Sequence, residues 1–201
     1  MTMVLAALLG IGIGSLPTAD WLARSRGVDL RASGSGNPGT NNALRVGGRG
    51  LAMSVLAAEI VKGAAAVVAG HRIGADTAAA LAGLGATAGN VYNPWFRGKG
   101  GKGLAITGGI LLAAWPAMAA VLIAVLAAAV AGFRRTGPAT LTALSVYGVV
   151  AVVGLGVDLP SGGLIDAAPA LLMLAAGCIA LLMPKHLADT LRSGGPPKSP
   201  G

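Results

Sequence analysis

The chain has 201 residues, of which 54% are apolar, 11% are charged and 3% are aromatic, a composition that predicts a membrane protein rather than a soluble domain. Lys and Arg outnumber Asp and Glu by 15 to 7, giving a net charge of +8, but so few aromatic side chains for base stacking argue against nucleic-acid binding. The single cysteine, Cys178, cannot form an internal disulfide or complete a thiolate metal site, and two histidines, His71 and His186, argue against a multi-histidine metal centre. We therefore expect no metal and no cofactor.

Six apolar runs are candidate helices, and the segments between them contain nearly all of the Arg, Lys, Pro and Asn residues. The runs are 3–23, 51–70, 73–90, 104–132, 139–157 and 167–184. As one helix, the fourth run would be ~43 Å long against a hydrocarbon core of ~30 Å, and it contains Pro116. The alternative to a single crossing is a half-helix over 104–114, followed after Pro116 by a second span.

The distribution of basic residues favours the half-helix, because such residues accumulate on the cytoplasmic side of a membrane. With it, 13 of the 15 basic residues lie on one side: Arg24, Arg26, Arg31, Arg45, Arg49, Arg97, Lys99, Lys102, Arg134, Arg135, Lys185, Arg192 and Lys198. A single crossing would export Arg134, Arg135 and the basic tail. We therefore expect an all-α, polytopic membrane protein of about seven helical segments, with the N-terminus outside and the C-terminus in the cytoplasm. Residues 1–192 would form a single membrane domain and residues 193–201 a disordered tail.

The first cytoplasmic segment has a composition suited to anion binding. It runs Gly34-Ser35-Gly36-Asn37-Pro38-Gly39-Thr40-Asn41-Asn42-Ala43-Leu44-Arg45. Glycines let backbone N–H groups converge on an anion, Ser and Asn add neutral donors, and Arg supplies a bidentate fork for phosphate. A flexible polar loop without a specific ligand is the alternative for this stretch on its own.

The second segment, Arg97-Gly98-Lys99-Gly100-Gly101-Lys102-Gly103, leads directly into the half-helix at Leu104. A helix start with free N–H groups, preceded by glycines and a lysine, is suited to phosphate, although the segment lacks the Ser or Thr that follows the Lys of a Walker P-loop. The alternative is a simple positive-inside anchor. The two loops share one side of the membrane, and together they are more specific than either one.

Three further side chains are expected on the same side. Thr140 lies near the start of a helix, where a hydroxyl is as often an N-cap as a ligand. His186 and Asp189 close the last helix and would share one of its faces at i, i+3 spacing. A histidine at a helix C-terminus can also be only a partner of the helix dipole.

Two charge pairs lie elsewhere in the sequence. Glu59 and Lys62 are three residues apart within a span, where charges are costly enough to predict either a buried ion pair or a function. His71 and Asp76 have the H-x4-D spacing that resembles the catalytic pair of acyl-CoA-dependent glycerolipid acyltransferases. They fall in the outer turn, away from every basic loop, and we interpret this match as chance.

Together these residues resemble the bacterial acyl-phosphate:glycerol-3-phosphate acyltransferases, integral membrane enzymes of seven helices, over about residues 12–192. The G-S-I-P of the family's first helix corresponds to Gly14-Ser15-Leu16-Pro17, and its loop G-S-G-N-x-G-A-T-N corresponds to Gly34 through Asn42, followed by Arg45. The D-x-x-K-G motif appears as Glu59-Ile60-Val61-Lys62-Gly63. The G-H-x-x-P-x-F…G-G-K-G block appears as Gly89-Asn90 through Gly100-Gly101-Lys102-Gly103, with an unchanged interval.

The sequence departs from the family pattern at four places. The family's A-T in the first loop is Thr40-Asn41, its G-H is Gly89-Asn90, its Ser at the start of the sixth helix is Thr140, and its terminal H-R-x-N is His186-Leu187-Ala188-Asp189. Asn90 keeps hydrogen bonding but does not titrate near neutrality. Asp189 brings a negative charge towards a site that must bind phosphates. The chain therefore resembles a divergent member of the family.

The resemblance implies transfer of a fatty acyl group from acyl phosphate to glycerol 3-phosphate, giving lysophosphatidic acid and phosphate, at a site facing the cytoplasm of a bacterial inner membrane. The implied partners are the two substrates and the lipid bilayer, with a monomer as the simplest assembly. Catalytic roles fall on His186, Thr140 and Lys102. Substrate binding falls on Ser35, Gly36, Asn37, Asn41, Asn42, Arg45, Asn90, Gly100, Gly101 and Asp189, with the N–H groups of Gly100 and Gly101 as donors to phosphate.

Two other functions remain open from the sequence. A small transporter or channel for an anionic solute would use the same loops as a vestibule, but it would also require facing polar residues at mid-membrane on several helices. The sequence offers mainly Glu59 and Lys62. A non-catalytic paralogue that binds lipid phosphate is the second alternative.

Overall fold

The computed structural model describes residues 1–157 and 160–193, and these residues form helices and no strand. The predicted disordered tail lies outside the described residues, except for Ser193 at the end of the last helix. The elements are α1 (Thr2–Ser15), α2 (Thr18–Arg24), α3 (Thr40–Val91), the 3-10 turn η1 (Pro94–Phe96), α4 (Leu104–Ala114), α5 (Pro116–Phe133), α6 (Thr136–Val153) and α7 (Ala168–Ser193).

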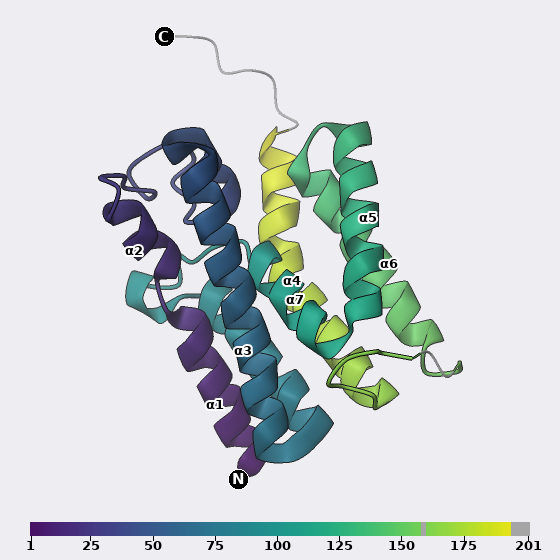
Figure 1. The fold of residues 1–201 in the computed structure, drawn as a ribbon. Helices are drawn as coiled ribbons and strands as arrows, with labels where there is room; N and C mark the ends of the chain where they lie inside the picture. Colours follow the sequence, from purple (N-terminus) through teal and green to yellow (C-terminus); the bar gives the residue numbers. More distant parts are fainter. Residues whose placement is uncertain (158–159, 194–201) are drawn as a thin grey trace.

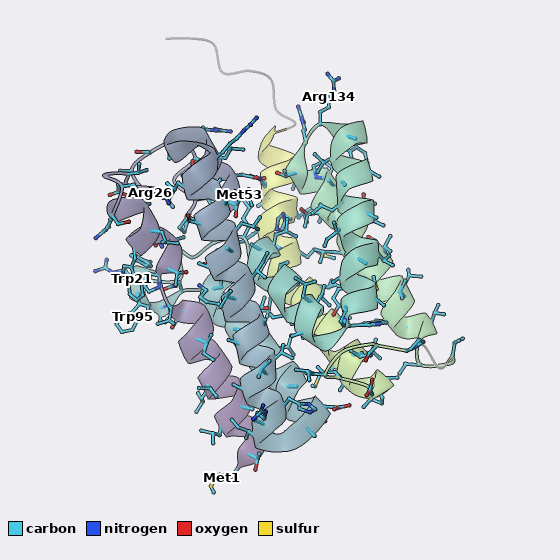
Figure 2. The ribbon with its side chains drawn as sticks, in the orientation of Figure 1. Met1, Trp21, Arg26, Met53, Trp95 and Arg134 are labelled. Carbon is cyan, nitrogen blue, oxygen red and sulfur yellow. The ribbon has the colours of Figure 1, made fainter. Side chains whose placement is uncertain are left out.

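The helices form one bundle, with the N-terminus at one end and the end of α7 at the other (Figure 1). Five stretches of the described chain are long and apolar enough to cross a membrane: Thr2–Arg24, Thr40–Phe96, Pro116–Phe133, Thr136–Val153 and Ala168–Leu191. The all-α, polytopic membrane architecture expected from the sequence is confirmed. Figure 2 shows Arg26 and Arg134 at the same end of the bundle, opposite Met1.

The run 3–23 is not one helix, contrary to expectation. It breaks at Leu16, whose backbone is extended (φ −57°, ψ 123°), and α2 begins at Thr18. Pro17 causes the break, because its ring disfavours the helical conformation for the residue before it and it has no N–H to donate.

Helix α3 is not one straight helix, because non-helical residues interrupt it at two places. Gly48 adopts a positive φ of 75°, and Gly74 and Ala75 also leave the helical region. After the second break the chain folds back on itself, so that a Cβ on Gly70 would contact Ala78 and Ala82. The predicted spans 51–70 and 73–90 are therefore the two arms of this hairpin.

The predicted half-helix over 104–114 is confirmed as α4. It ends at Trp115, which has a non-helical backbone (φ −150°, ψ 72°), and Pro116 occupies the first turn of α5. Proline suits that position because the first helical N–H has no partner within the helix. The chain then returns through α5 to the end of the bundle at which α7 also ends (Figure 1).

Glycines set the close approach of α1 to the second arm of α3. A Cβ on Gly10 or Gly14 would overlap the backbone of Ala82 or Ala86, respectively. In the other direction, a Cβ on Gly85 or Gly89 would overlap the backbone of α1. The four-residue spacing on both helices is the small-residue pattern that allows helices in a membrane to pack backbone to backbone.

Helix α7 continues beyond the predicted end at residue 184. Pro184 lies inside it and the helix runs on to Ser193, so His186 and Asp189 are in the body of a helix rather than at its C-terminus. Their i, i+3 spacing still places both on one face.

Candidate active site

A cavity of about 450 Å³ opens at the basic end of the bundle and extends among α3, α4, α5, α6 and α7. Its polar part includes Ser35, Asn37, Asn41, Asn42, Asn90, Gly101, Lys102, Thr140 and His186. Its apolar part includes Leu111, Leu112, Ala119, Leu122, Ile123 and Leu126. Nine of the thirteen residues predicted for the site therefore line one amphipathic cavity.

The remaining four predicted residues line two adjoining hollows. Gly36 and Gly100 line one of about 520 Å³, which shares Ser35 and Asn37 with the main cavity. Arg45 and Asp189 line the other, of about 490 Å³, together with Asn41, Arg134 and Arg135. The three hollows meet around the first loop, so the sequence-predicted residues form one contiguous polar region.

Asn42 organises the first loop. Its Nδ2 donates to the carbonyl oxygens of Leu30 and Ser33 at 2.8 and 3.0 Å, and its Oδ1 accepts from the N–H of Ser35 at 2.8 Å. These contacts use both amide hydrogens and hold the loop against the start of α3. Asn42 thus positions Ser35 and has no free donor to offer a ligand.

Arg31 joins the first loop to the second. Its guanidinium makes a bidentate contact with Asp20, at 2.9 and 3.0 Å, and donates to the carbonyl of Lys99 at 2.7 Å. It also lies 3.4 Å from the centre of the Phe96 ring. The same loop carries Asp29, whose pKa is lowered because its carboxylate accepts hydrogen bonds from the N–H groups of Arg31 and Ala32.

The N–H groups of Gly100 and Gly101 are already engaged. They donate to the carbonyls of Val91 and Asn90 at 3.2 and 3.1 Å, so in this conformation they are not available to an anion. Lys185, a residue that the sequence reasoning did not assign, donates from Nζ to the carbonyls of Val91, Gly100 and Gly101. The free donors of this segment are instead the first N–H groups of α4, which have no partner within the helix.

The buried side chain of His186 is 3% exposed and reaches the cavity. Its Nε2 lies 3.3 Å from the carbonyl oxygen of Lys102, while its buried Nδ1 has no hydrogen-bond partner among the described residues. A carbonyl can only accept, so the neutral ring carries its proton on Nε2 and presents the lone pair of Nδ1. This arrangement leaves His186 with one nitrogen able to accept a proton.

Thr140 is fully buried in the wall of the cavity. Its Oγ donates to the carbonyl of Thr136, one turn earlier in α6, at 2.8 Å. The lone pairs of the hydroxyl remain able to accept a hydrogen bond.

The ammonium group of Lys102 contacts the carboxylate of Asp189, with Nζ 2.6 Å from Oδ2. Asp189 is the acidic member of a hollow that also contains Arg45, Arg134 and Arg135. The ion pair therefore stands at the border between the main cavity and this arginine-lined hollow.

Asn90 belongs to a buried network below the loops. Its Nδ2 donates to Glu59 at 2.6 Å, and Glu59 also contacts Lys62 and Thr18, each at 2.9 Å. Lys62 donates further to the carbonyls of Gly14 and Leu16. The predicted Glu59–Lys62 ion pair is confirmed, and it satisfies carbonyl groups that the break at Pro17 leaves without helical partners.

The other charge pair lies away from the cavity. The carboxylate of Asp76 accepts from the N–H groups of Asp166 and Ala167, directly before α7, at 3.0 and 2.7 Å, and lies 3.9 Å from His71. His71 and Asp76 therefore lie near the start of α7, whereas His186 lies near its other end. This position agrees with the interpretation that their spacing matches the acyltransferase pattern by chance. Within residues 1–157 and 160–193, no group of three or more His, Cys, Asp and Glu side chains is placed to hold a metal.

Comparison with known proteins finds relatives that are described as glycerol-3-phosphate acyltransferases. The sequence profile of the glycerol-3-phosphate acyltransferase family matches residues 4–193. A glycerol-3-phosphate acyltransferase of Synechococcus sp. (strain JA-3-3Ab) is 46% identical over 118 residues, and this match spans only 58% of each chain. One of Bradyrhizobium sp. (strain BTAi1 / ATCC BAA-1182) is 41% identical over 140 residues, or 69% of this chain and 70% of the relative.

Two solved structures share the fold. The crystal structure of PlsY (YgiH), an integral membrane glycerol 3-phosphate acyltransferase, in its glycerol 3-phosphate form matches with a TM-score of 0.76 and 25% identity, covering 96% of this chain and 90% of that chain. The lysphosphatidic acid form matches with a TM-score of 0.79 and 23% identity, covering 96% and 93%.

Proposed function

This chain belongs to the glycerol-3-phosphate acyltransferase family, and from this premise we propose that it transfers a fatty acyl group from acyl phosphate to glycerol 3-phosphate. The products are lysophosphatidic acid and inorganic phosphate. The observation that carries the proposal is the amphipathic cavity, which joins Lys102 and His186 at its polar part to an apolar interior between α4 and α5.

The apolar part of the cavity suits the fatty acyl chain. Each methylene removed from water contributes about 0.8 kcal/mol, so the chain of the donor supplies binding energy that holds its reactive end at the polar part. The side chains of Leu111, Leu122 and Leu126 line this region. Once the acyl chain lies among these apolar side chains, the phosphate end of the donor is held at a fixed distance from them. This restricts the position of the bond between the acyl carbon and the phosphate oxygen.

The polar part contains donors for phosphate. At one position, Lys102 and the first N–H groups of α4 supply a positive charge and the positive end of a helix dipole. At the other, Ser35 and Asn37 supply neutral donors in the main cavity, and Arg45 supplies a guanidinium fork from the adjoining hollow. Two separate phosphate positions are what a donor and an acceptor that both carry phosphate require.

In the proposed reaction, the acceptor hydroxyl oxygen attacks the acyl carbonyl carbon directly. Nδ1 of His186 accepts the hydroxyl proton, and the hydroxyl oxygen of Thr140, whose own hydrogen is donated to Thr136, accepts a hydrogen bond that orients the acceptor. The bond between the carbonyl carbon and the phosphate oxygen then breaks, and phosphate leaves with the electron pair of that bond. Because an acyl phosphate is already activated, positioning and neutralisation of the leaving charge by Lys102 supply most of the acceleration.

We further propose that the basic end of the bundle faces the cytoplasm of a bacterial inner membrane. Basic residues accumulate at cytoplasmic membrane surfaces, and Arg26 and Arg134 lie at this end (Figure 2). Trp21 and Trp95 are exposed on one side of the bundle, between the levels of Arg26 and Met1 (Figure 2). Exposed tryptophans are typical of the boundary between the hydrocarbon core and water.

The test is a turnover assay with purified protein in detergent. Palmitoyl phosphate and glycerol 3-phosphate should yield lysophosphatidic acid, whereas palmitoyl-CoA offered as the donor should not. Failure to form the product beside an active member of the family would overturn the enzyme proposal and leave a transporter or a binding protein. Turnover with palmitoyl-CoA at an equal rate would overturn the donor assignment alone.

A further inference from the structure

Asp189 occupies the charged position that a phosphate ligand would need. Its Oδ2 lies 2.6 Å from Nζ of Lys102, which is the distance of a charge-assisted contact. Among the described residues, this carboxylate is the one anionic group in contact with that lysine. In the free protein, the Asp189 carboxylate thus occupies the place at Lys102 where we expect a substrate phosphate to bind.

The surroundings of the pair allow this contact to open. The Lys102 and Asp189 side chains are 33% and 42% exposed, and ion pairs with this degree of exposure are weak because water and salt screen them. Arg45, Arg134 and Arg135 line the hollow beside Asp189. A carboxylate released from Lys102 would therefore remain among positive charges rather than be left unpaired.

The buried ion pair of Glu59 and Lys62 is held more firmly than the pair of Lys102 and Asp189. Glu59 and Lys62 are only 6% exposed and hold additional partners in Thr18, Asn90 and two carbonyl groups. Several buried contacts therefore hold that network together, whereas in the part of the chain that the structure describes Lys102 is the single side-chain partner of Asp189. The Glu59–Lys62 pair is therefore suited to a structural role, and the Lys102–Asp189 pair is suited to opening.

We infer that Asp189 is an affinity-determining residue: its carboxylate is an internal competitor that holds Lys102 until a phosphate group displaces it. The inference rests on the proposed function only for the identity of the substrate. It implies that the protein binds phosphate more weakly than the same site would without the carboxylate, because the ligand must break one ion pair to form another.

The first experiment measures phosphate binding without turnover. The midpoint of thermal unfolding of the purified protein is followed against inorganic phosphate at constant ionic strength, which yields an apparent Kd. In the variant Asp189→Asn we expect this Kd to fall about threefold to tenfold, because a partly exposed ion pair and a nearby like charge are both removed. Asp189→Glu keeps the charge and should remain within about twofold of the wild type.

Asp166→Asn provides the matched control, since it removes the same charge before α7, at the end of that helix away from Lys102, and should leave the Kd unchanged. An Asp189→Asn protein that binds phosphate no more tightly, or more weakly, than the wild type would overturn the inference and show that Asp189 only positions Lys102. An equal gain in Asp166→Asn would overturn it as well, because the effect would then be one of net charge.

A second readout separates affinity from chemistry. In the acyltransferase assay, Asp189→Asn should lower the KM for glycerol 3-phosphate or for palmitoyl phosphate by a similar factor, with kcat changed less than about twofold. A lower kcat with an unchanged KM for both would contradict competition. Because the Kd measurement needs no turnover, an inactive protein with a tightened phosphate Kd would count against the proposed function and not against this inference.

Discussion

The imidazole Nε2 of His186 lies 3.3 Å from the main-chain carbonyl oxygen of Lys102. This contact between α7 and the loop before α4 fixes the protonated nitrogen of the ring, and Nδ1 has no partner within residues 1–157 and 160–193. The same loop residue therefore orients the proposed base through its backbone and supplies the proposed phosphate ligand through its side chain.

Replacing His186 with Gln tests the role of Nδ1. The amide of Gln can still donate towards the Lys102 carbonyl, but it offers no basic nitrogen, so we expect kcat to fall by a factor of about 10² to 10⁴ while the KM values change little. Leu187→Gln is the control, because this neighbouring side chain is exposed. Near-normal kcat in His186→Gln would transfer the role of base to the substrate phosphate.

The buried ion pair of Glu59 and Lys62 predicts that loss of one partner destabilises the protein. Lys62→Met leaves the Glu59 carboxylate without its cation in a buried position and should lower the free energy of unfolding by about 3–5 kcal/mol. The double variant Glu59→Gln with Lys62→Met should recover much of this loss, because it leaves no unpaired charge. Thermal unfolding in detergent measures both, and equal losses in the single and double variants would show that the ion pair itself is not the stabilising feature.

The close packing of α1 against α3 predicts a contrast between two neighbouring glycines. A Cβ at position 14 would overlap the backbone of Ala86, whereas a Cβ at position 12 has no described atom within 4 Å. Gly14→Ala should therefore destabilise the protein by about 1–3 kcal/mol, and Gly12→Ala should be neutral or slightly stabilising. Equal unfolding midpoints for the two variants would contradict the helix contact described here.

The apolar part of the cavity predicts a change in donor preference. Ala119 on α5 lines it, while the next residue, Ala120, is exposed. A larger side chain in Ala119→Phe should shift the ratio of kcat/KM for decanoyl phosphate over palmitoyl phosphate upward by about tenfold or more, since lost methylene contacts cost about 0.8 kcal/mol each. Ala120→Phe should leave the ratio unchanged, and an unchanged ratio in both would place the acyl chain elsewhere.

Local patterns in the sequence were sufficient to predict several features of the fold. The length of the run 104–132, together with Pro116, correctly separated α4 from α5, because no straight helix of that length fits a bilayer. The spacing of Glu59 and Lys62 correctly predicted an ion pair. The break at Pro17 was missed although the proline was visible, because the apolar run on both sides of it suggested one span.

Other features of the site depend on tertiary contacts that no local pattern contains. Asn42 was expected to bind substrate, yet its amide is used by the carbonyls of Leu30 and Ser33. The Gly100 and Gly101 amides are engaged because the second loop folds back onto the end of α3. Lys185 could have been noticed as the neighbour of His186, but its three carbonyl partners lie more than eighty residues away in sequence.

The most direct test of the account compares two lysines of the same loop. Lysophosphatidic acid and inorganic phosphate are quantified together from palmitoyl phosphate and glycerol 3-phosphate, using wild-type protein, Lys102→Ala and Lys99→Ala. We predict equal amounts of the two products in the wild type and in Lys99→Ala, and a loss of turnover of at least about a hundredfold in Lys102→Ala with an unfolding midpoint close to that of the wild type. Undiminished turnover in Lys102→Ala, or phosphate release that does not depend on glycerol 3-phosphate, would contradict direct transfer at this site.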